Sequence, residues 1–157
     1  MTFKDVLASI PTGVFILTSK SNSGDYCAAV ISSVICLDAA ENNGLILFTL
    51  SKSSSSFLRI NESQKFSLDL LSDSSEPAAR KYSSSSGPIV SDMMNSFEEK
   101  SCGDLHFKSH VATLCCTLSS HQFIADKVII FANVKDFNVI PNNGVLGYFR
   151  RSFIQVI

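Results

Sequence analysis

Residues 27–56, CAAVISSVICLDAAENNGLILFTLSKSSSS, decide the fold. Apolar and β-branched residues fill positions 26–37, which predicts a strand that is mostly buried. The Asn-Asn-Gly at the end of residues 38–44 indicates a turn, and LILFTL at 45–50 predicts a second strand. Both strands carry small polar residues, and we expect these to meet in one place.

The second strand stops at a serine-rich loop, and a helix is expected to begin there. Ser51, Ser53 or Ser54 can cap that helix, which Phe57 then continues. Free N–H groups at a helix start, together with hydroxyls and an ammonium, attract a phosphate. The candidate phosphate ligands are Ser51, Lys52, Ser53, Ser54 and Ser56. An ordinary serine cap on a surface helix is the alternative.

The rest of the chain predicts one mainly β domain over residues 1–157. A short amphipathic helix is expected at 3–10, and a polar hairpin loop at 19–25. Further strands are predicted at 14–19, 66–71, 111–118 and 128–134, the last continuing over 136–140 after a bulge. Many antiparallel strands with short connections favour a closed or nearly closed barrel, and no GxGxxG motif indicates a Rossmann site.

Composition excludes several kinds of partner. The formal net charge is -1 with 13 Lys and Arg, so no broad basic surface is expected for nucleic acid. No apolar run has the length of a membrane helix, and residues 1–13 lack the apolar core of a signal peptide, so we expect no membrane association and a cytoplasmic protein.

The cysteines and histidines predict no metal site. The five cysteines have neither CxxC nor Cys/His zinc spacing, and reduced thiols are expected. His106 and His110 are four residues apart, but no third ligand is evident beside them. His121 is placed in a loop between two strands, and the adjacent Cys115 and Cys116 are expected to alternate between core and surface.

Residues 72–94 are rich in serine and read as a solvated excursion, with a short helix after Pro77. A lid over a ligand site is the alternative for this segment.

Residues 30–57, VISSVICLDAAENNGLILFTLSKSSSSF, resemble the strand, turn, strand and Ser/Thr loop of the flavin reductase-like, FMN-binding split-barrel family. PTGVFILTS at 11–19 and KFSLDLLS at 65–72 are similar to the strands that flank this motif in the family, and GVLGYFRRSF at 144–153 is a weaker match. The resemblance implies an antiparallel split β-barrel that binds FMN or FAD, forms a homodimer and uses NADH or NADPH as reductant.

The same resemblance implies roles for particular residues. Groups at Val30, Ile31, Ser32 and Ser33 would bind the polar edge of the isoalloxazine, and the serine-rich loop would bind the ribityl phosphate. Tyr148 and Arg150 resemble the aromatic and basic residues that close the site in the family.

One departure from the family bears on catalysis. The family usually has Gly-Asp-His where this chain has Ala125, Asp126 and Lys127. Asp126 and Lys127 are therefore the catalytic candidates, although a lysine of ordinary pKa cannot shuttle a proton near neutral pH. The first hypothesis is an NAD(P)H-dependent flavin reductase that supplies a partner monooxygenase. The alternatives are a flavin-binding protein without turnover and a structural barrel with an empty pocket.

Overall fold

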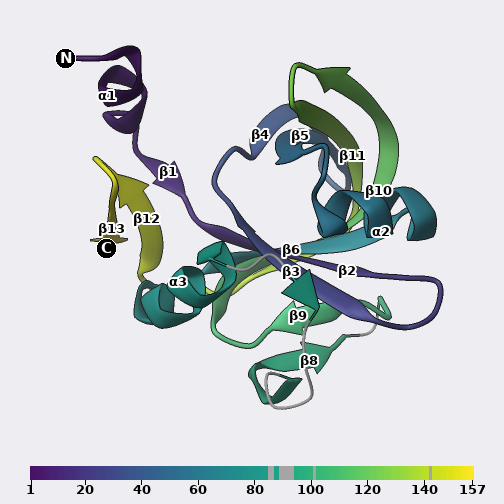
Figure 1. The fold of residues 1–157 in the computed structure, drawn as a ribbon. Helices are drawn as coiled ribbons and strands as arrows, with labels where there is room; N and C mark the ends of the chain where they lie inside the picture. Colours follow the sequence, from purple (N-terminus) through teal and green to yellow (C-terminus); the bar gives the residue numbers. More distant parts are fainter. Residues whose placement is uncertain (85–86, 89–93, 101, 142) are drawn as a thin grey trace.

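A curled antiparallel sheet forms the body of the molecule (Figure 1), described by a computed structural model over residues 1–84, 87–88, 94–100, 102–141 and 143–157. Its eight strands lie in the order β4-β5-β11-β10-β6-β2-β3-β7. They are β2 (Phe15–Lys20), β3 (Tyr26–Ile31), β4 (Ile35–Ala39), β5 (Gly44–Ser51), β6 (Lys65–Leu71), β7 (Gly87–Pro88), β10 (His110–Ile124) and β11 (Lys127–Val139). The predicted antiparallel split barrel is confirmed; β4 and β7 remain as edges, so the sheet does not close.

Smaller elements surround this sheet. A three-stranded sheet comprises β1 (Thr12–Gly13), β12 (Val145–Phe149) and β13 (Ser152–Val156). A separate hairpin comprises β8 (Phe97–Glu99) and β9 (Leu105–Phe107). The helices are α1 (Phe3–Ala8), α2 (Ser55–Ser63) and α3 (Glu76–Ser84), with 3-10 turns at Asp73–Ser75 and Met94–Ser96. The longest described helices, α2 and α3, have 9 residues each, and none has the length and apolarity to span a bilayer.

Two hydrophobic cores lie on opposite faces of the sheet. The inner core is enclosed by the curled strands and capped by α2, and its largest buried side chains are Leu17, Phe48, Ile60, Phe66, Leu68 and Ile130. The outer core lies between the sheet and α3, the β8–β9 hairpin and β12, and includes Ile16, Leu71, Tyr82, Phe97, Phe107 and Leu146. Because both faces are covered, β2 and β6 are buried along most of their length.

The strand predicted over residues 26–37 is in fact two strands, β3 and β4, separated at 32–34. The hydroxyl of Ser33 accepts the Thr49 N–H at 3.1 Å, a bond to β5 that replaces a regular ladder contact. A polar side chain that bonds to the backbone of another strand competes with continued pairing, and the chain leaves β3 there.

The β10–β11 hairpin is longer than predicted, because its strands extend through the expected loop to a turn at Ala125 and Asp126. His121 therefore pairs with Ile130 within the hairpin and does not lie in a loop. The predicted bulge is confirmed: Cys115 pairs with Asp136 and Cys116 with Val134, which leaves one extra residue between the two pairs.

Two expectations about the cysteines were wrong. Cys115 and Cys116 point to opposite faces, but both are buried because the β8–β9 hairpin covers the outer face at Cys115. Cys115 also forms a disulfide with Cys102, whereas reduced thiols were expected throughout. These two cysteines are 13 residues apart, and only the return of β9 along β6 brings them together.

The helix predicted after Pro77 is α3, with Pro77 in its first turn. Residues 85–86 and 89–93 of the segment proposed as an excursion or lid lie outside the described residues.

Candidate functional site

The ends of several strands surround the larger of two adjoining cavities, with a volume of about 660 Å³. It opens where β3 and β5 end, where β11 begins and where α3 passes. Its lining residues are Ala29, Val30, Ile31, Ser32, Ser33, Thr49, Leu50, Ser51, Ser53, Ser54, Tyr82, Ser83 and Lys127. This volume and this mixture of apolar wall and hydroxyl groups are typical of sites for small organic ligands.

The break between β3 and β4 supplies one wall of the cavity. Ser32 and Ser33 follow the last residue of β3, and the backbone there is released from the β3 ladder. Ser33 is held in place by Thr49, whose N–H donates to its hydroxyl and whose own hydroxyl lies 3.3 Å away. The wall therefore has a fixed geometry, with polar groups positioned at the edge of an apolar space.

The serine-rich loop between β5 and α2 supplies a second wall. Ser54 caps α2, and its hydroxyl accepts the Ser56 N–H at 3.2 Å. The hydroxyls of Ser51 and Ser53 lie 3.1 Å apart at the same helix start. The first turn of a helix has N–H groups without partners in the helix and a partial positive charge, so this wall can bind an anion.

The turn between β10 and β11 is tied to this loop. Lys127 pairs with Ser51 across the β5–β11 ladder, and the Lys52 N–H donates to the carbonyl of Asp126 at 3.0 Å. The Lys127 side chain is 54% exposed, and its Nζ lies 3.8 Å from Asp126 Oδ2. Lys127 thus brings a cation to the rim of the cavity, while the Asp126 side chain is 83% exposed and points to solvent.

A second cavity of about 440 Å³ shares Val30, Ile31, Ser32 and Ser83 with the first. Its other wall is aromatic and cationic: Tyr148 and Phe153 stack edge to face at 5.3 Å, and the Arg80 guanidinium lies 5.1 Å from the Phe153 ring centre. Arg151 also lines this cavity, and its Nη2 is 2.7 Å from Asp5 Oδ1. An arginine pair beside stacked rings suits a phosphate joined to a planar ring system.

Most predicted site residues come together in these cavities, and four do not line them. Lys52 lies with its Nζ 5.3 Å from the Phe123 ring centre, and Ser56 is fully buried with its hydroxyl toward Cys27. Asp126 points to solvent, and Arg150 lines a separate hollow near α1. The role predicted for Arg150 at the cavity is available instead to its neighbour Arg151.

Sequence reasoning missed other lining residues, chiefly Thr49, Arg80, Tyr82, Ser83, Arg151 and Phe153. Thr49 carried a usable signal, because it is the one polar residue in the apolar strand LILFTL. The residues of α3 carried no such signal, because the packing of α3 beside β3 cannot be predicted from the local sequence.

Comparison with known proteins supports the family read from the sequence. Residues 7–156 match the flavin reductase like domain. A flavin reductase from Pseudomonas putida is 24% identical over 151 residues, covering 96% of this chain and 86% of the relative.

Solved structures agree on the fold. The flavin reductase component of a bacterial two-component tryptophan halogenase superposes with a TM-score of 0.85 at 16% identity, over 98% of this chain and 95% of that one. An NADH:FAD oxidoreductase from Streptomyces globisporus superposes with a TM-score of 0.83 at 18% identity, over 98% of this chain and 91% of that one. The styrene monooxygenase flavin reductase from Pseudomonas putida superposes with a TM-score of 0.82 at 17% identity, over 100% of this chain and 98% of that one.

The domain match spans nearly the whole chain, and it includes the strands and the serine-rich helix start on which the sequence resemblance rested. The predicted family and oxidoreductase class are therefore confirmed: the chain belongs to the flavin reductase-like domain family.

Proposed function

We propose that this protein is an NAD(P)H-dependent flavin reductase that binds FMN or FAD in the larger cavity. The observation that carries the proposal is the meeting of three separate segments there, namely the β3–β4 break, the serine-rich start of α2 and Lys127. Hydroxyls and helix N–H groups at one end suit a phosphate, and the apolar wall of Ala29, Ile31 and Leu50 suits a planar ring.

The chain's own residues would divide the work as follows. Ser51, Ser53 and Ser54 bind the phosphate, and the backbone from Ile31 to Ser33 binds the polar edge of the ring system. When bound, the flavin supplies the atom that accepts a hydride from the nicotinamide. The protein's contribution is then mainly to position the two ring systems and to exclude water between them.

The second cavity is the proposed entry for the nicotinamide nucleotide. Arg80 and Arg151 would bind its phosphates, and Tyr148 with Phe153 would pack against a ring. Lys127 stands where the family usually has histidine, and its ammonium can attract a nucleotide phosphate. The alternative of flavin binding without turnover is favoured by the same residue, because lysine does not replace the acid–base function of histidine near neutral pH.

Names of the similar proteins support a role in a two-component system. As their names state, one similar protein is the flavin reductase component of a two-component halogenase, and another is the flavin reductase of a styrene monooxygenase. We propose that this protein likewise supplies reduced flavin to a separate oxygenase or halogenase.

A homodimer is also proposed, supported by the exposure of α1. This helix stands away from the body in Figure 1, and its apolar residues Phe3, Val6 and Leu7 are 75%, 53% and 49% exposed. A second copy of the chain would bury this face. Sedimentation velocity tests it: Val6→Asp should shift a dimer toward monomer, and a wild-type monomer at micromolar concentration would refute the proposal.

The decisive experiment is an anaerobic absorbance titration with FMN or FAD, followed by NADH or NADPH in the same cuvette. Bleaching of the flavin band well above the protein-free rate supports the reductase. Binding without bleaching by either nucleotide supports the non-catalytic alternative, and absence of binding refutes the cavity assignment.

Two lysine variants make this experiment specific. Lys127→His restores the family's residue and should raise the rate of bleaching. Lys135→His is the matched control, because Lys135 lies on the same strand but is exposed and outside both cavities. Equal rates in both variants and the wild type would show that Lys127 does not contact the reacting groups.

A further inference from the structure

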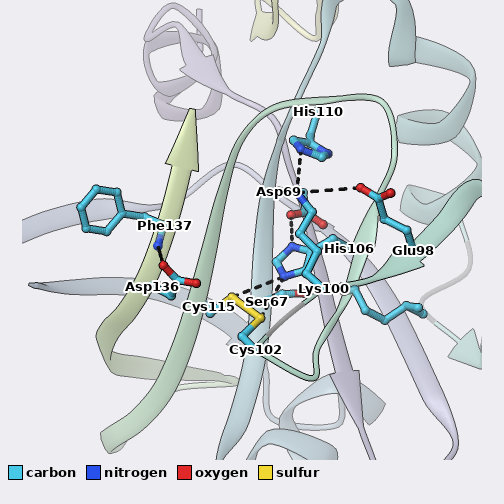
Figure 2. Close-up of a disulfide and its surroundings, with 11 residues drawn as sticks. Ser67, Asp69, Glu98, Lys100, Cys102, His106, His110, Cys115, Asp136 and Phe137 are labelled. Carbon is cyan, nitrogen blue, oxygen red and sulfur yellow. Dashed lines mark hydrogen bonds and ion pairs between the residues drawn. A yellow bond between two sulfur atoms is a disulfide. The ribbon is translucent and has the colours of Figure 1, made fainter. Parts of the chain in front are cut away.

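A cluster of sulfur and nitrogen atoms lies on the outer face of the sheet, apart from the two cavities. Figure 2 shows Cys102, from the turn that joins β8 and β9, beside Cys115 of β10, with the His106 ring of β9 facing both. His106 Nε2 lies 3.5 Å from Cys102 Sγ and 3.4 Å from Cys115 Sγ. The three ligand atoms all lie within 4.8 Å of one another.

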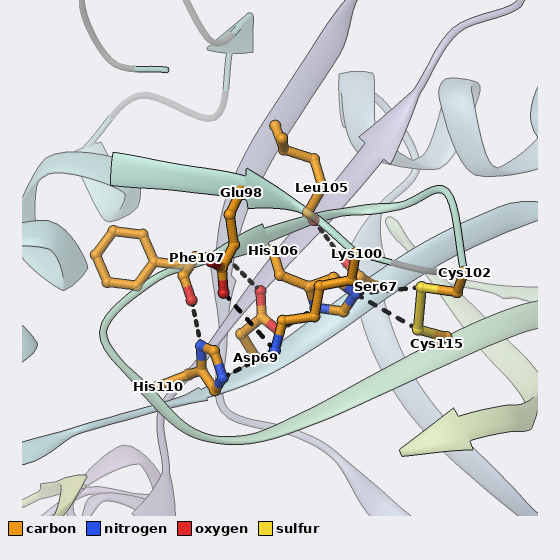
Figure 3. A network of polar contacts seen from close by, with 10 residues as sticks. All are labelled: Ser67, Asp69, Glu98, Lys100, Cys102, Leu105, His106, Phe107, His110 and Cys115. Atoms are coloured by element: carbon orange, nitrogen blue, oxygen red, sulfur yellow. Dashed lines mark hydrogen bonds and ion pairs between the residues drawn. A yellow bond between two sulfur atoms is a disulfide. The ribbon is translucent and has the colours of Figure 1, made fainter. Parts of the chain in front are cut away.

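Asp69 of β6 fixes the orientation of the imidazole. Its Oδ1 lies 2.6 Å from His106 Nδ1, and its Oδ2 accepts the Phe107 N–H at 2.7 Å (Figure 3). Asp69 and His106 are both fully buried. A carboxylate accepts hydrogen bonds, so Nδ1 carries the proton and the Nε2 position is directed at the two sulfurs.

The interaction between His106 Nε2 and the two sulfurs depends on whether Cys102 and Cys115 form a disulfide or are reduced. A disulfide has no hydrogen to donate, so in the oxidised form the sulfurs donate no hydrogen bond to His106 Nε2. Two thiolates and an imidazole nitrogen held within a few ångströms are a soft ligand set that binds a cation between them. A carboxylate on the far nitrogen of the imidazole is the usual support for such a ligand.

We propose that the reduced form of this cluster binds Zn²⁺ through Cys102 Sγ, Cys115 Sγ and His106 Nε2, with Asp69 as the positioning residue behind His106. Binding replaces the two thiol protons, which are released to solvent, and water fills the fourth position because Cys102 is only half-buried. The disulfide and the zinc form exclude each other, so zinc binds only when both cysteines are reduced. This site reverses the sequence-based expectation of no metal.

His110 does not belong to the site, although it lies only four residues from His106 in the sequence. Its Nδ1 contacts the carbonyl of Phe107, and its Nε2 lies 3.1 Å from Lys100 Nζ (Figure 3). Cys116 points into the inner core on the opposite face. The ligands therefore come from β9, its preceding turn and β10, and zinc would fasten the β8–β9 hairpin to the sheet.

The test titrates Co²⁺, and then Zn²⁺, into the reduced, metal-free full chain in anaerobic buffer with a phosphine reductant. One equivalent of Co²⁺ should produce sulfur-to-metal charge-transfer bands and the strong visible bands of tetrahedral cobalt, and Zn²⁺ should abolish both. Protein with the disulfide intact should give neither. The proposal is refuted if reduced protein with a full thiol count shows no charge-transfer band.

Variants assign the ligands. Cys102→Ser should remove the charge-transfer bands or reduce them by about half, whereas Cys36→Ser, at an exposed cysteine of β4, should leave them unchanged. Asp69→Asn should weaken zinc binding roughly 10- to 100-fold while the cobalt bands remain, because it acts through His106. Equal loss of the charge-transfer bands in Cys102→Ser and Cys36→Ser would refute the assignment of Cys102 as a ligand.

A measurement on the wild type removes any dependence on how the variants fold. Zn²⁺ should protect Cys102 and Cys115 from alkylation, read by mass spectrometry of the peptides, and should leave Cys36 as reactive as before. Equal alkylation of Cys102 with and without Zn²⁺ would overturn the proposal. Flavin titration of the same sample gives an independent readout, so failure of the zinc site and failure of the proposed reductase are distinguishable.

Discussion

Replacing Ala125 by glycine should stabilise the protein. Ala125 is the first of the two residues that turn β10 into β11, and its φ is 52°. An L-residue with a Cβ in this left-handed region carries a strain of about 1–2 kcal/mol, which glycine avoids. Glycine also makes the unfolded chain more flexible, and this offsets about 0.4–1 kcal/mol of the stability gained by removing the strain. Ala125 is exposed and contributes no core packing, so a net gain of about 0.5–1 kcal/mol is expected.

Equilibrium unfolding in urea measures this gain as a higher midpoint with an unchanged slope. Ala39→Gly is the matched control, because Ala39 is also exposed but lies in strand β4 with an ordinary backbone. That control should lose about 0.5–1 kcal/mol, since glycine is unfavourable within a strand. If Ala125→Gly lowers the midpoint as Ala39→Gly does, the turn is not strained and the reasoning from φ is wrong.

Three further changes test other parts of the structure. Ser54→Ala removes the cap of α2 and should cost about 1 kcal/mol in urea unfolding as well as weaken FMN binding; an unchanged midpoint would show that the cap is replaced by water. Gly144→Ala places a Cβ against the Asp73 carboxylate and should cost about 1 kcal/mol or more, so a wild-type melting temperature would contradict the close approach. Hydrogen bonds from the Thr2 backbone and side chain lower the pKa of Asp5 below 3.8. The contribution of this contact to folding stability is therefore full above pH 3.8 and is lost as the pH falls through the lowered pKa. An NMR titration that gives Asp5 a pKa of 3.8 or higher would refute this.

The strands were predictable where apolar residues and turn signals coincide. The runs at β5, β6 and β11 have both, and each strand was found within one or two residues of its predicted ends. The break after β3 was not predictable, because Ser32 and Ser33 interrupt an apolar run that a single strand could equally accommodate. Ser33 ends the strand only because Thr49 of β5 lies beside it, a contact that local sequence does not encode.

The first cavity was largely predictable, since its serines come from one continuous stretch of chain. The second cavity was not, because Arg80, Arg151 and Phe153 are brought together by the packing of α3 against the β12–β13 hairpin. The family resemblance pointed to Arg150, but which of Arg150 and Arg151 lines the cavity depends on the direction each side chain takes from the turn. Positive φ values of 49° and 63° at these two residues set that direction.

The cysteine cluster shows why spacing alone did not reveal that these residues lie together. Cys102 and His106 are four residues apart, and Cys115 follows nine residues later on the next strand, a pattern that matches no common zinc motif. A fourth residue, Asp69, contributes its carboxylate from β6, which is more than 30 residues earlier in the chain. Only the pairing of β6 with β10, together with the hairpin laid over them, makes one site from these residues.

Strand register makes Lys127 the most informative position in the proposed active site. Lys127 is paired with Ser51, and a slip of one residue between β5 and β11 would turn its side chain to the other face of the sheet. The bond from the Lys52 N–H to the Asp126 carbonyl fixes this register at the end of the ladder. A histidine at 127 would therefore leave the strand at the same point and in the same direction as the lysine. Any change in the rate of flavin reduction in Lys127→His then reports on the chemistry of the side chain, because the backbone that positions it is held from both sides.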